Sequence, residues 1–193
     1  MGPLYALDIE TDTTIDGRDP SVAAVIAVSI ADAEGPLTVL TGPEQMVLRA
    51  TIAALDALEP GIVATWNGAG FDIPFIQERC DLLGISTGWS VTPTDRPSKY
   101  PPIGDRSGRY SCVLGRHNHA DIAWGWQAYC AHNSVTWSLK PLAHSLGIEA
   151  IEADREHAAE LLRDELFAYV ASDAHVTAVL AQRLGESIVD HLD

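Results

Sequence analysis

Short apolar runs along the chain predict the strands of one sheet. Five runs stand out, at residues 4–9, 22–31, 37–41, 62–66 and 118–123. The run at 22–31 is nearly all apolar, which indicates a strand in the middle of the sheet. Ala33 to Pro36 has the composition of a hairpin turn, so the first three strands should form an antiparallel meander.

Apolar residues at helical spacing predict the remaining elements. These helices are expected at residues 43–58, 71–83, 126–131, 139–146 and 155–184. Residues 86–116 are rich in Pro, Gly, Ser and Arg, so they should form a long loop or an insertion. The order of elements predicts an α/β fold with a mixed five-stranded sheet flanked by helices, within a single domain spanning 1–193.

Composition narrows the class of protein. The 193 residues are 47% hydrophobic and 20% charged, which is ordinary for a globular domain. No apolar run reaches about 18 residues, and the N-terminus lacks a basic leader before an apolar stretch. The cysteines Cys80, Cys112 and Cys130 fit no zinc or disulfide spacing. We therefore expect a cytoplasmic protein with reduced thiols and no membrane partner.

The net charge of −15 argues against an extended basic footprint on nucleic acid. Basic residues nevertheless gather in one segment, as Arg96, Lys99, Arg106, Arg109 and Arg116. An enzyme that handles only the end of a strand needs fewer phosphate contacts than a repressor does. Charge alone therefore does not exclude a nuclease.

Two acids alternate on the first predicted strand. Asp8 and Glu10 point to one face, while Leu7 and Ile9 point to the other. Two neighbouring carboxylates repel unless one is protonated or a cation lies between them. Mg²⁺ or Mn²⁺ suits such oxygen ligands, although two ordinary surface acids would give the same pattern.

Two further acids are candidates for the same site. Asp72 begins a predicted helix after the Gly-rich turn that starts at Asn67, where it could cap the helix or face the acids of the first strand. Asp173 lies in the inward stripe of the last helix, one turn after Tyr169. A buried acid there requires a partner, a metal or a proton; a half-exposed Asp beside a structural Tyr is the alternative.

Three motifs in order carry a resemblance to a known family. They are Asp8-Ile9-Glu10, the segment from Asn67 to Ile76 around Asp72, and Tyr169-x-x-x-Asp173. Together they resemble the DEDD, or DnaQ-like, 3′→5′ exonuclease superfamily, in its Tyr subgroup. The second motif is most similar to the proofreading domains of family B DNA polymerases. The resemblance covers about residues 4–185 and implies a ribonuclease H-like fold.

The resemblance also implies a chemistry. Two Mg²⁺ or Mn²⁺ ions would be held by Asp8, Glu10, Asp72 and Asp173. Tyr169 would orient the attacking water, and Thr11 and Asn67 would hold the terminal nucleotide. The expected reaction is hydrolysis of single-stranded 3′ ends, of DNA first and of RNA as the alternative, to nucleoside 5′-monophosphates. An inert nucleic-acid-binding subunit is a third reading, although none of the four acids is missing.

The setting of this activity stays open. The resemblance is compatible with a stand-alone nuclease or with a subunit beside a polymerase or repair partner. Among other polar residues, His117 and His119 are expected on the surface, and Asp121 is expected to cap the next helix. The tryptophans Trp124, Trp126 and Trp137 are expected to pack in the core or at its edge.

Overall fold

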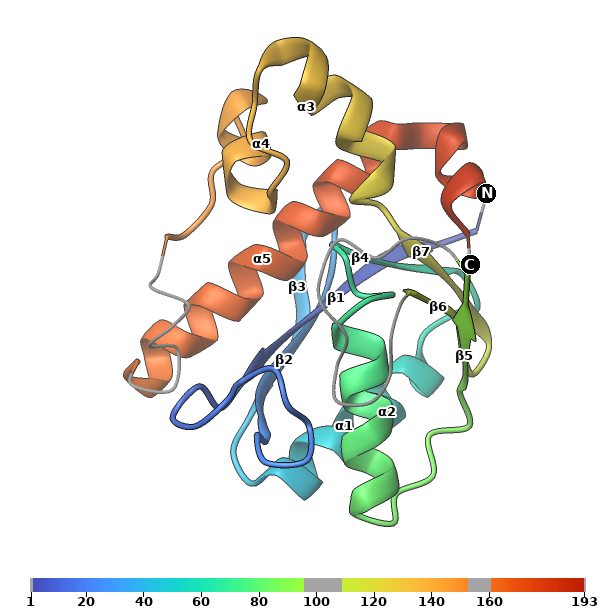
Figure 1. Ribbon diagram of the computed structural model, residues 1–193, viewed down its shortest axis with the longest axis vertical. Coiled ribbons are helices and arrows are strands. Elements are labelled where there is room, and N and C mark those ends of the chain that lie inside the picture. Colours follow the sequence, from blue (N-terminus) through green and yellow to red (C-terminus); the bar gives the residue numbers. More distant parts are fainter. Residues whose placement is uncertain (1, 96–108, 153–160, 193) are drawn as a thin grey trace.

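The computed structural model describes residues 2–95, 109–152 and 161–192 (Figure 1). Its sheet has the strand order β3-β2-β1-β4-β7-β6-β5. The strands are β1 Leu4–Thr11, β2 Val25–Asp32, β3 Gly35–Thr41, β4 Ile62–Thr65, β5 Ser90–Thr94, β6 Arg109–Leu114 and β7 His117–Asp121. Neighbours β1, β4 and β7 run parallel and all other pairs are antiparallel, so the predicted mixed sheet and the meander of the first three strands are confirmed.

The expected number of strands is wrong. Seven strands are present in the described part of the chain, because β5 and β6 arise from the segment that its composition marked as a loop. Pro93 lies within β5 and pairs with Tyr110. Since β5 is the last strand of the sheet, a proline there leaves no central ladder hydrogen bond unmade. The basic residues at 96–108 lie outside the described residues.

Helices cover both faces of the sheet. They are α1 Glu44–Ala57, α2 Asp72–Leu82, α3 Gln127–Asn133, α4 Leu139–Ser145 and α5 Arg163–Leu184, with the 3₁₀ turns η1 Trp124–Trp126 and η3 Gly185–His191. The start expected for the last helix at 155 lies outside the described residues. None of the helices in the described ranges has the length and apolarity needed to cross a membrane.

The alternation of β1 divides the core in two. Leu7 and Ile9 pack with residues of α1 and α2 in one cluster. Ala6, on the opposite face, packs with residues of α3, α4 and α5 in another. Figure 1 shows α5 running diagonally across β1, β2 and β3, all of which it contacts. Side chains on the α5 face of β1 are therefore held between the sheet and this helix.

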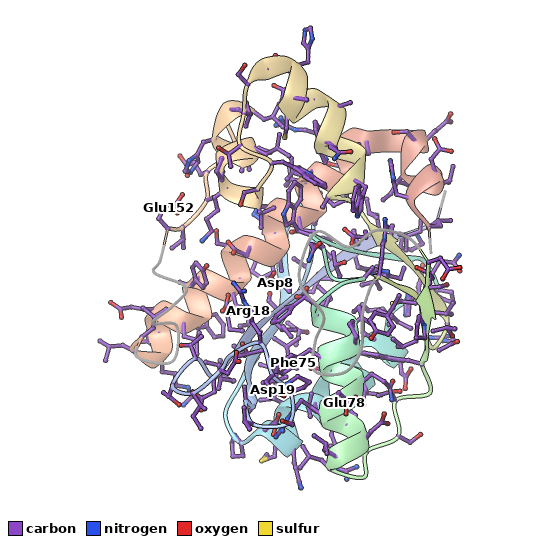
Figure 2. The ribbon with its side chains drawn as sticks, viewed as in Figure 1. Asp8, Arg18, Asp19, Phe75, Glu78 and Glu152 are labelled. Atoms are coloured by element: carbon purple, nitrogen blue, oxygen red, sulfur yellow. The ribbon has the colours of Figure 1, made fainter. Side chains whose placement is uncertain are left out.

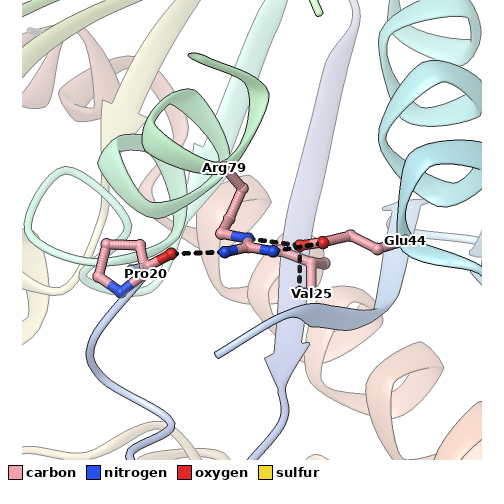
Figure 3. Close-up of polar contacts among 4 residues, drawn as sticks. All are labelled: Pro20, Val25, Glu44 and Arg79. Carbon is pink, nitrogen blue, oxygen red and sulfur yellow. Dashed lines mark hydrogen bonds and ion pairs between the residues drawn. The ribbon is translucent and has the colours of Figure 1, made fainter. Parts of the chain in front are cut away.

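One ion pair ties the first two helices to the start of β2 (Figure 3). Both nitrogens of Arg79 that face Glu44 donate to its carboxylate, at 2.7 Å from Nε and 2.6 Å from Nη2. Arg79 Nη1 also donates to the carbonyl of Pro20 at 2.7 Å. The backbone N–H of Val25 donates to Glu44 Oε1 at 2.9 Å. The pair thereby fixes the end of the loop that follows β1.

The expectation of surface histidines is wrong. His117 and His119 are 1% and 0% exposed, because other groups cover their face of β7; the ring of His117, for example, meets that of Tyr5 with centroids 5.9 Å apart. His117 Nε2 hydrogen-bonds the carbonyl of Leu55 at 2.9 Å, and His119 Nε2 hydrogen-bonds Thr65 Oγ1 at 2.8 Å. The two buried rings therefore connect β7 to α1 and to β4.

Candidate active site

The first two acids lie on the α5 face of β1. Asp8 pairs in register with Ser29 and Glu10 with Ala27, so both are held in regular antiparallel ladder. The ladder shifts register between Glu10 and Thr11, the last residue of the strand. Figure 2 shows Asp8 near the middle of the molecule, and both carboxylates are half-buried. The predicted alternation of β1 is thus the arrangement that brings the two acids to one face.

Asp173 of α5 completes a group of three acids. One carboxylate oxygen from each of Asp8, Glu10 and Asp173 lies within 4.8 Å of the other two. Asp173 is 1% exposed, as its position in the inward stripe of the last helix suggests. Three converging carboxylates are a donor set that fits Mg²⁺ or Mn²⁺, which prefer hard oxygen ligands.

A buried lysine adjoins this group. The Nζ atom of Lys140, from α4, lies 3.3 Å from Asp173 Oδ1. The same atom lies 3.8 Å from the centre of the Tyr169 ring and donates a hydrogen bond to the carbonyl of Ile151. Tyr169 is fully buried and Lys140 is 5% exposed. The two residues of the third motif therefore share one cation.

The fourth predicted acid lies beside the group and not within it. Asp72 is the first residue of α2 and is buried. Its Oδ1 accepts a hydrogen bond from the N–H of Ile9 at 3.3 Å, between the two acids of β1. Burial raises the pKa of Asp72 to about 7; backbone N–H donors and His119 oppose this shift, and Asp121 reinforces it. Three of the predicted ligands are thus brought together, and the fourth contacts the strand that carries two of them.

The turn before Asp72 has a left-handed residue and a position that only glycine can occupy. Asn67 adopts φ 67°, and its N–H donates to Asp121 Oδ1 at 2.9 Å. The N–H of Gly68 donates to Thr65 Oγ1 at 3.0 Å. A Cβ at Gly68 would lie 2.4 Å from that same hydroxyl oxygen, so only glycine fits. The position of Asp72 therefore depends on polar contacts made by the ends of β4 and β7.

Asp121 is the residue that sequence reasoning undervalued. It is 1% exposed, and Oδ1 accepts hydrogen bonds from the amides of Asn67 and Ala123. Its Oδ2 has no hydrogen-bond partner among the residues that the structure describes. Burial raises the pKa of Asp121, while Arg109 and His119 act in the opposite direction. The available signal was its place at the end of a strand parallel to β4, since carboxyl ends of parallel strands meet at one edge.

The two predicted substrate contacts are both buried. Thr11 donates its hydroxyl hydrogen to the carbonyl of Gly17 at 2.6 Å and so helps to close the loop after β1. Asn67 is 4% exposed, in the turn described above. Their roles toward a nucleotide stay predictions.

The tryptophans pack against one another and against the core. Trp124 and Trp137 meet edge to face with ring centres 4.9 Å apart, and Trp126 is 8% exposed. Trp137 Nε1 donates to the carbonyl of Ala123. Trp124 and Trp126 belong to η1, which is separated from the end of β7 by Ile122 and Ala123.

The mixed sheet with helices on both faces matches the ribonuclease H-like fold of polymerase exonuclease domains. The family B DNA polymerase from the hyperthermophilic archaeon Pyrobaculum calidifontis superposes on 94% of this chain with a TM-score of 0.67, at 18% identity. The match uses 24% of that polymerase chain. At this identity the comparison shows a shared fold, and it confirms the predicted fold class.

The sequence comparisons find similar proteins for part of the chain. Residues 23–99 match the model of the DNA polymerase family B exonuclease domain, a segment that includes Asn67 and Asp72. A DNA polymerase from Pyrococcus horikoshii is 30% identical over 91 residues, which are 42% of this chain, and one from Thermococcus kodakarensis is 26% identical over 130 residues, which are 62%. The chain spans 7% of the length of each. Over part of its length the chain is therefore similar to the exonuclease domains of family B DNA polymerases, which supports the resemblance that the motifs carry; the Tyr subgroup stays a prediction.

Proposed function

We propose that this chain is a metal-dependent 3′→5′ exonuclease that releases nucleoside 5′-monophosphates from single-stranded 3′ ends. The observation that carries the proposal is the convergence of Asp8, Glu10 and Asp173. Domains of this type use divalent metals, and the three oxygens offer the hard ligands that Mg²⁺ and Mn²⁺ prefer. We take residues 1–193 as one catalytic domain, with an insertion within 86–116.

Each acid has a proposed role. Asp8, Glu10 and Asp173 bind one divalent ion, and Asp72 supports a second from its place beside Ile9. When bound, such ions activate the attacking water and stabilise charge on the leaving 3′ oxygen. Asp72 must be ionised to take part. Its pKa of about 7 means that it loses its proton near neutral pH, and a bound cation would favour the ionised form further.

The remaining proposed roles concern water and the terminal nucleotide. Tyr169 lies one helical turn before Asp173, so its hydroxyl can orient a water near the same ligands. Thr11 follows the acids of β1 directly, and Asn67 begins the turn that leads to Asp72. We propose that these two residues contact the last nucleotide.

DNA is the proposed polymer. The relatives reported above are DNA polymerases, and this observation favours DNA over RNA. We further propose that the domain acts either alone or beside a polymerase or repair protein. The acidic net charge of −15 suits contacts limited to a strand end.

Oligonucleotides labelled at either end test the proposal. Purified protein with Mn²⁺ should shorten single-stranded DNA from the 3′ end and release labelled mononucleotide. Asp8→Ala and Asp173→Ala should abolish the release, whereas Asp81→Ala, which removes an exposed acid of α2, should not. Equal shortening by the wild type and Asp8→Ala would contradict the proposal. Faster shortening of RNA would replace DNA as substrate, and Mn²⁺ binding without any shortening would indicate an inert subunit.

A further inference from the structure

Lys140 is a buried lysine whose ammonium contacts both residues of the third motif. The chain has a single other lysine, Lys99. Among the described arginines most are exposed, while Arg79 is half-buried and Arg109 is buried. The Lys140 ammonium lies 3.3 Å from Asp173 Oδ1 and 3.8 Å from the centre of the Tyr169 ring, and it donates to the carbonyl of Ile151. Because Lys140 is only 5% exposed, these groups take the place of most of the water that would hydrate its ammonium.

The energetics of this arrangement depend on the acids around it. A buried ammonium is tolerated only when a charge or several acceptors compensate for its lost hydration. Here the compensating carboxylate belongs to the group in which Asp8, Glu10 and Asp173 repel one another. A cation over an aromatic ring face is also attracted to that ring. One ammonium therefore relieves the repulsion and orients both residues of the third motif.

We propose that Lys140 is the built-in counter-cation of the acidic site and a positioning residue for Asp173 and Tyr169. Lys140 holds these two side chains in place before a metal binds. It also repels the incoming divalent ion and so weakens metal affinity while it improves the geometry for reaction. The catalytic part of this inference rests on the proposed exonuclease function; the part on metal affinity does not.

The size of the effect on affinity follows from Coulomb's law. An ion coordinated by Asp173 would come within ~5–6 Å of the ammonium, since metal–oxygen bonds are ~2.1 Å long. Even with the dielectric constant of water, repulsion of a divalent ion at that distance corresponds to ~10-fold in dissociation constant. Removal of the charge should tighten binding by about this factor.

A purely structural role for Lys140 would give weaker, not tighter, metal binding when its charge is removed. If Lys140 only supported the fold, its loss would loosen Asp173 and weaken metal binding together with activity. The counter-cation role instead predicts that affinity and turnover change in opposite directions. This divergence separates the two explanations.

Calorimetric titration of the metal-free protein with Mn²⁺ measures the change in metal affinity. Lys140→Met keeps an apolar stem and removes the charge. We expect its dissociation constant to fall about tenfold. Arg183→Met is the matched control, because it removes an exposed cation from the same helix as Asp173 and changes the net charge equally. That control should stay within about twofold of the wild type.

The rate of mononucleotide release and the melting temperature test the expected loss of activity. At saturating Mn²⁺, Lys140→Met should release mononucleotide at least tenfold more slowly, and Lys140→Arg should recover part of the loss because it restores the charge. In EDTA, Lys140→Met should melt below the wild type, and Mn²⁺ should raise its melting temperature more than it raises that of the wild type. Lys140→Gln, which keeps a hydrogen-bond donor, provides the same comparison if Lys140→Met does not fold.

The outcomes for the two proposals are distinct. Equal or weaker Mn²⁺ binding by the Lys140 variants overturns the counter-cation role, whatever the activity. Mn²⁺ binding by the wild type without hydrolysis overturns the exonuclease function, while the ratio of dissociation constants still decides the role of Lys140 in metal affinity. Absence of Mn²⁺ binding by the wild type overturns both.

Discussion

Replacement of Asp72 by Asn should make the metal-free protein more stable at alkaline pH. Asn has the same shape and keeps an oxygen to accept the N–H of Ile9, but it has no charge to bury. Burial raises the pKa of Asp72 from 3.8 to about 7, so the folded state favours the protonated acid. Its carboxyl group therefore costs the fold nothing below about pH 3.8, and the cost grows until the pH passes about 7.

The magnitude follows from the difference in pKa. The interval from 3.8 to about 7 is about 3 pKa units, and at 1.36 kcal/mol per unit it amounts to about 4 kcal/mol. Asp72→Asn should thus gain up to about 4 kcal/mol in free energy of unfolding at pH 8 and very little at pH 4. A gain of this kind is typical of active-site acids, which are kept for function at a cost in stability.

Urea unfolding in EDTA at pH 4.5, 6 and 8 measures this directly. Asp81→Asn, at an exposed position of the same helix, is the control and should show no such trend. The reasoning is refuted if the gain at pH 8 is no larger than at pH 4.5, or if Asp72→Asn is the less stable protein at pH 8. Addition of Mn²⁺ should reduce the gain at pH 8, because the ion that Asp72 is proposed to support would stabilise only the wild type.

Three further changes test the framework around the site. Arg79→Met breaks the ion pair with Glu44, in which both side chains are 13% exposed. It should lower the free energy of unfolding in urea by about 2–4 kcal/mol, and replacement of both partners by Leu should lower it less. Gly68→Ala places a methyl group against Thr65 and should cost about 1–3 kcal/mol; an unchanged melting temperature would show that the turn can relax. Asp121→Ala removes the acceptor for two buried amides and should cost about 2 kcal/mol and lower exonuclease turnover, whereas full activity would show that the turn needs no such support.

The acids of the site could be predicted because their positions follow from local periodicity. The strand period of two put Asp8 and Glu10 on one face, and the helical period put Asp173 in an inward stripe; the structure has both. Where one face of an element is buried, its register is strongly specified. The sequence thus contained most of the information about this group.

Other features depended on tertiary packing that no local pattern carries. The burial of His117 and His119 depends on groups that the fold brings over β7, such as the Tyr5 ring and the Leu55 carbonyl of α1, and a strand of polar residues does not reveal them. The contact of Lys140 with Asp173 arises because α4 packs on α5. Such contacts join residues far apart in the chain, so spacing cannot indicate them.

Mn²⁺-dependent release of mononucleotide from a 3′-labelled single strand tests the central claim most directly. The wild type should release nucleoside 5′-monophosphate stepwise from the 3′ end. Asp8→Asn, which removes one charge from the group of three acids and preserves side-chain shape, should release none while it stays folded in EDTA. Release at the same rate by Asp8→Asn, or none by the wild type, would contradict the account.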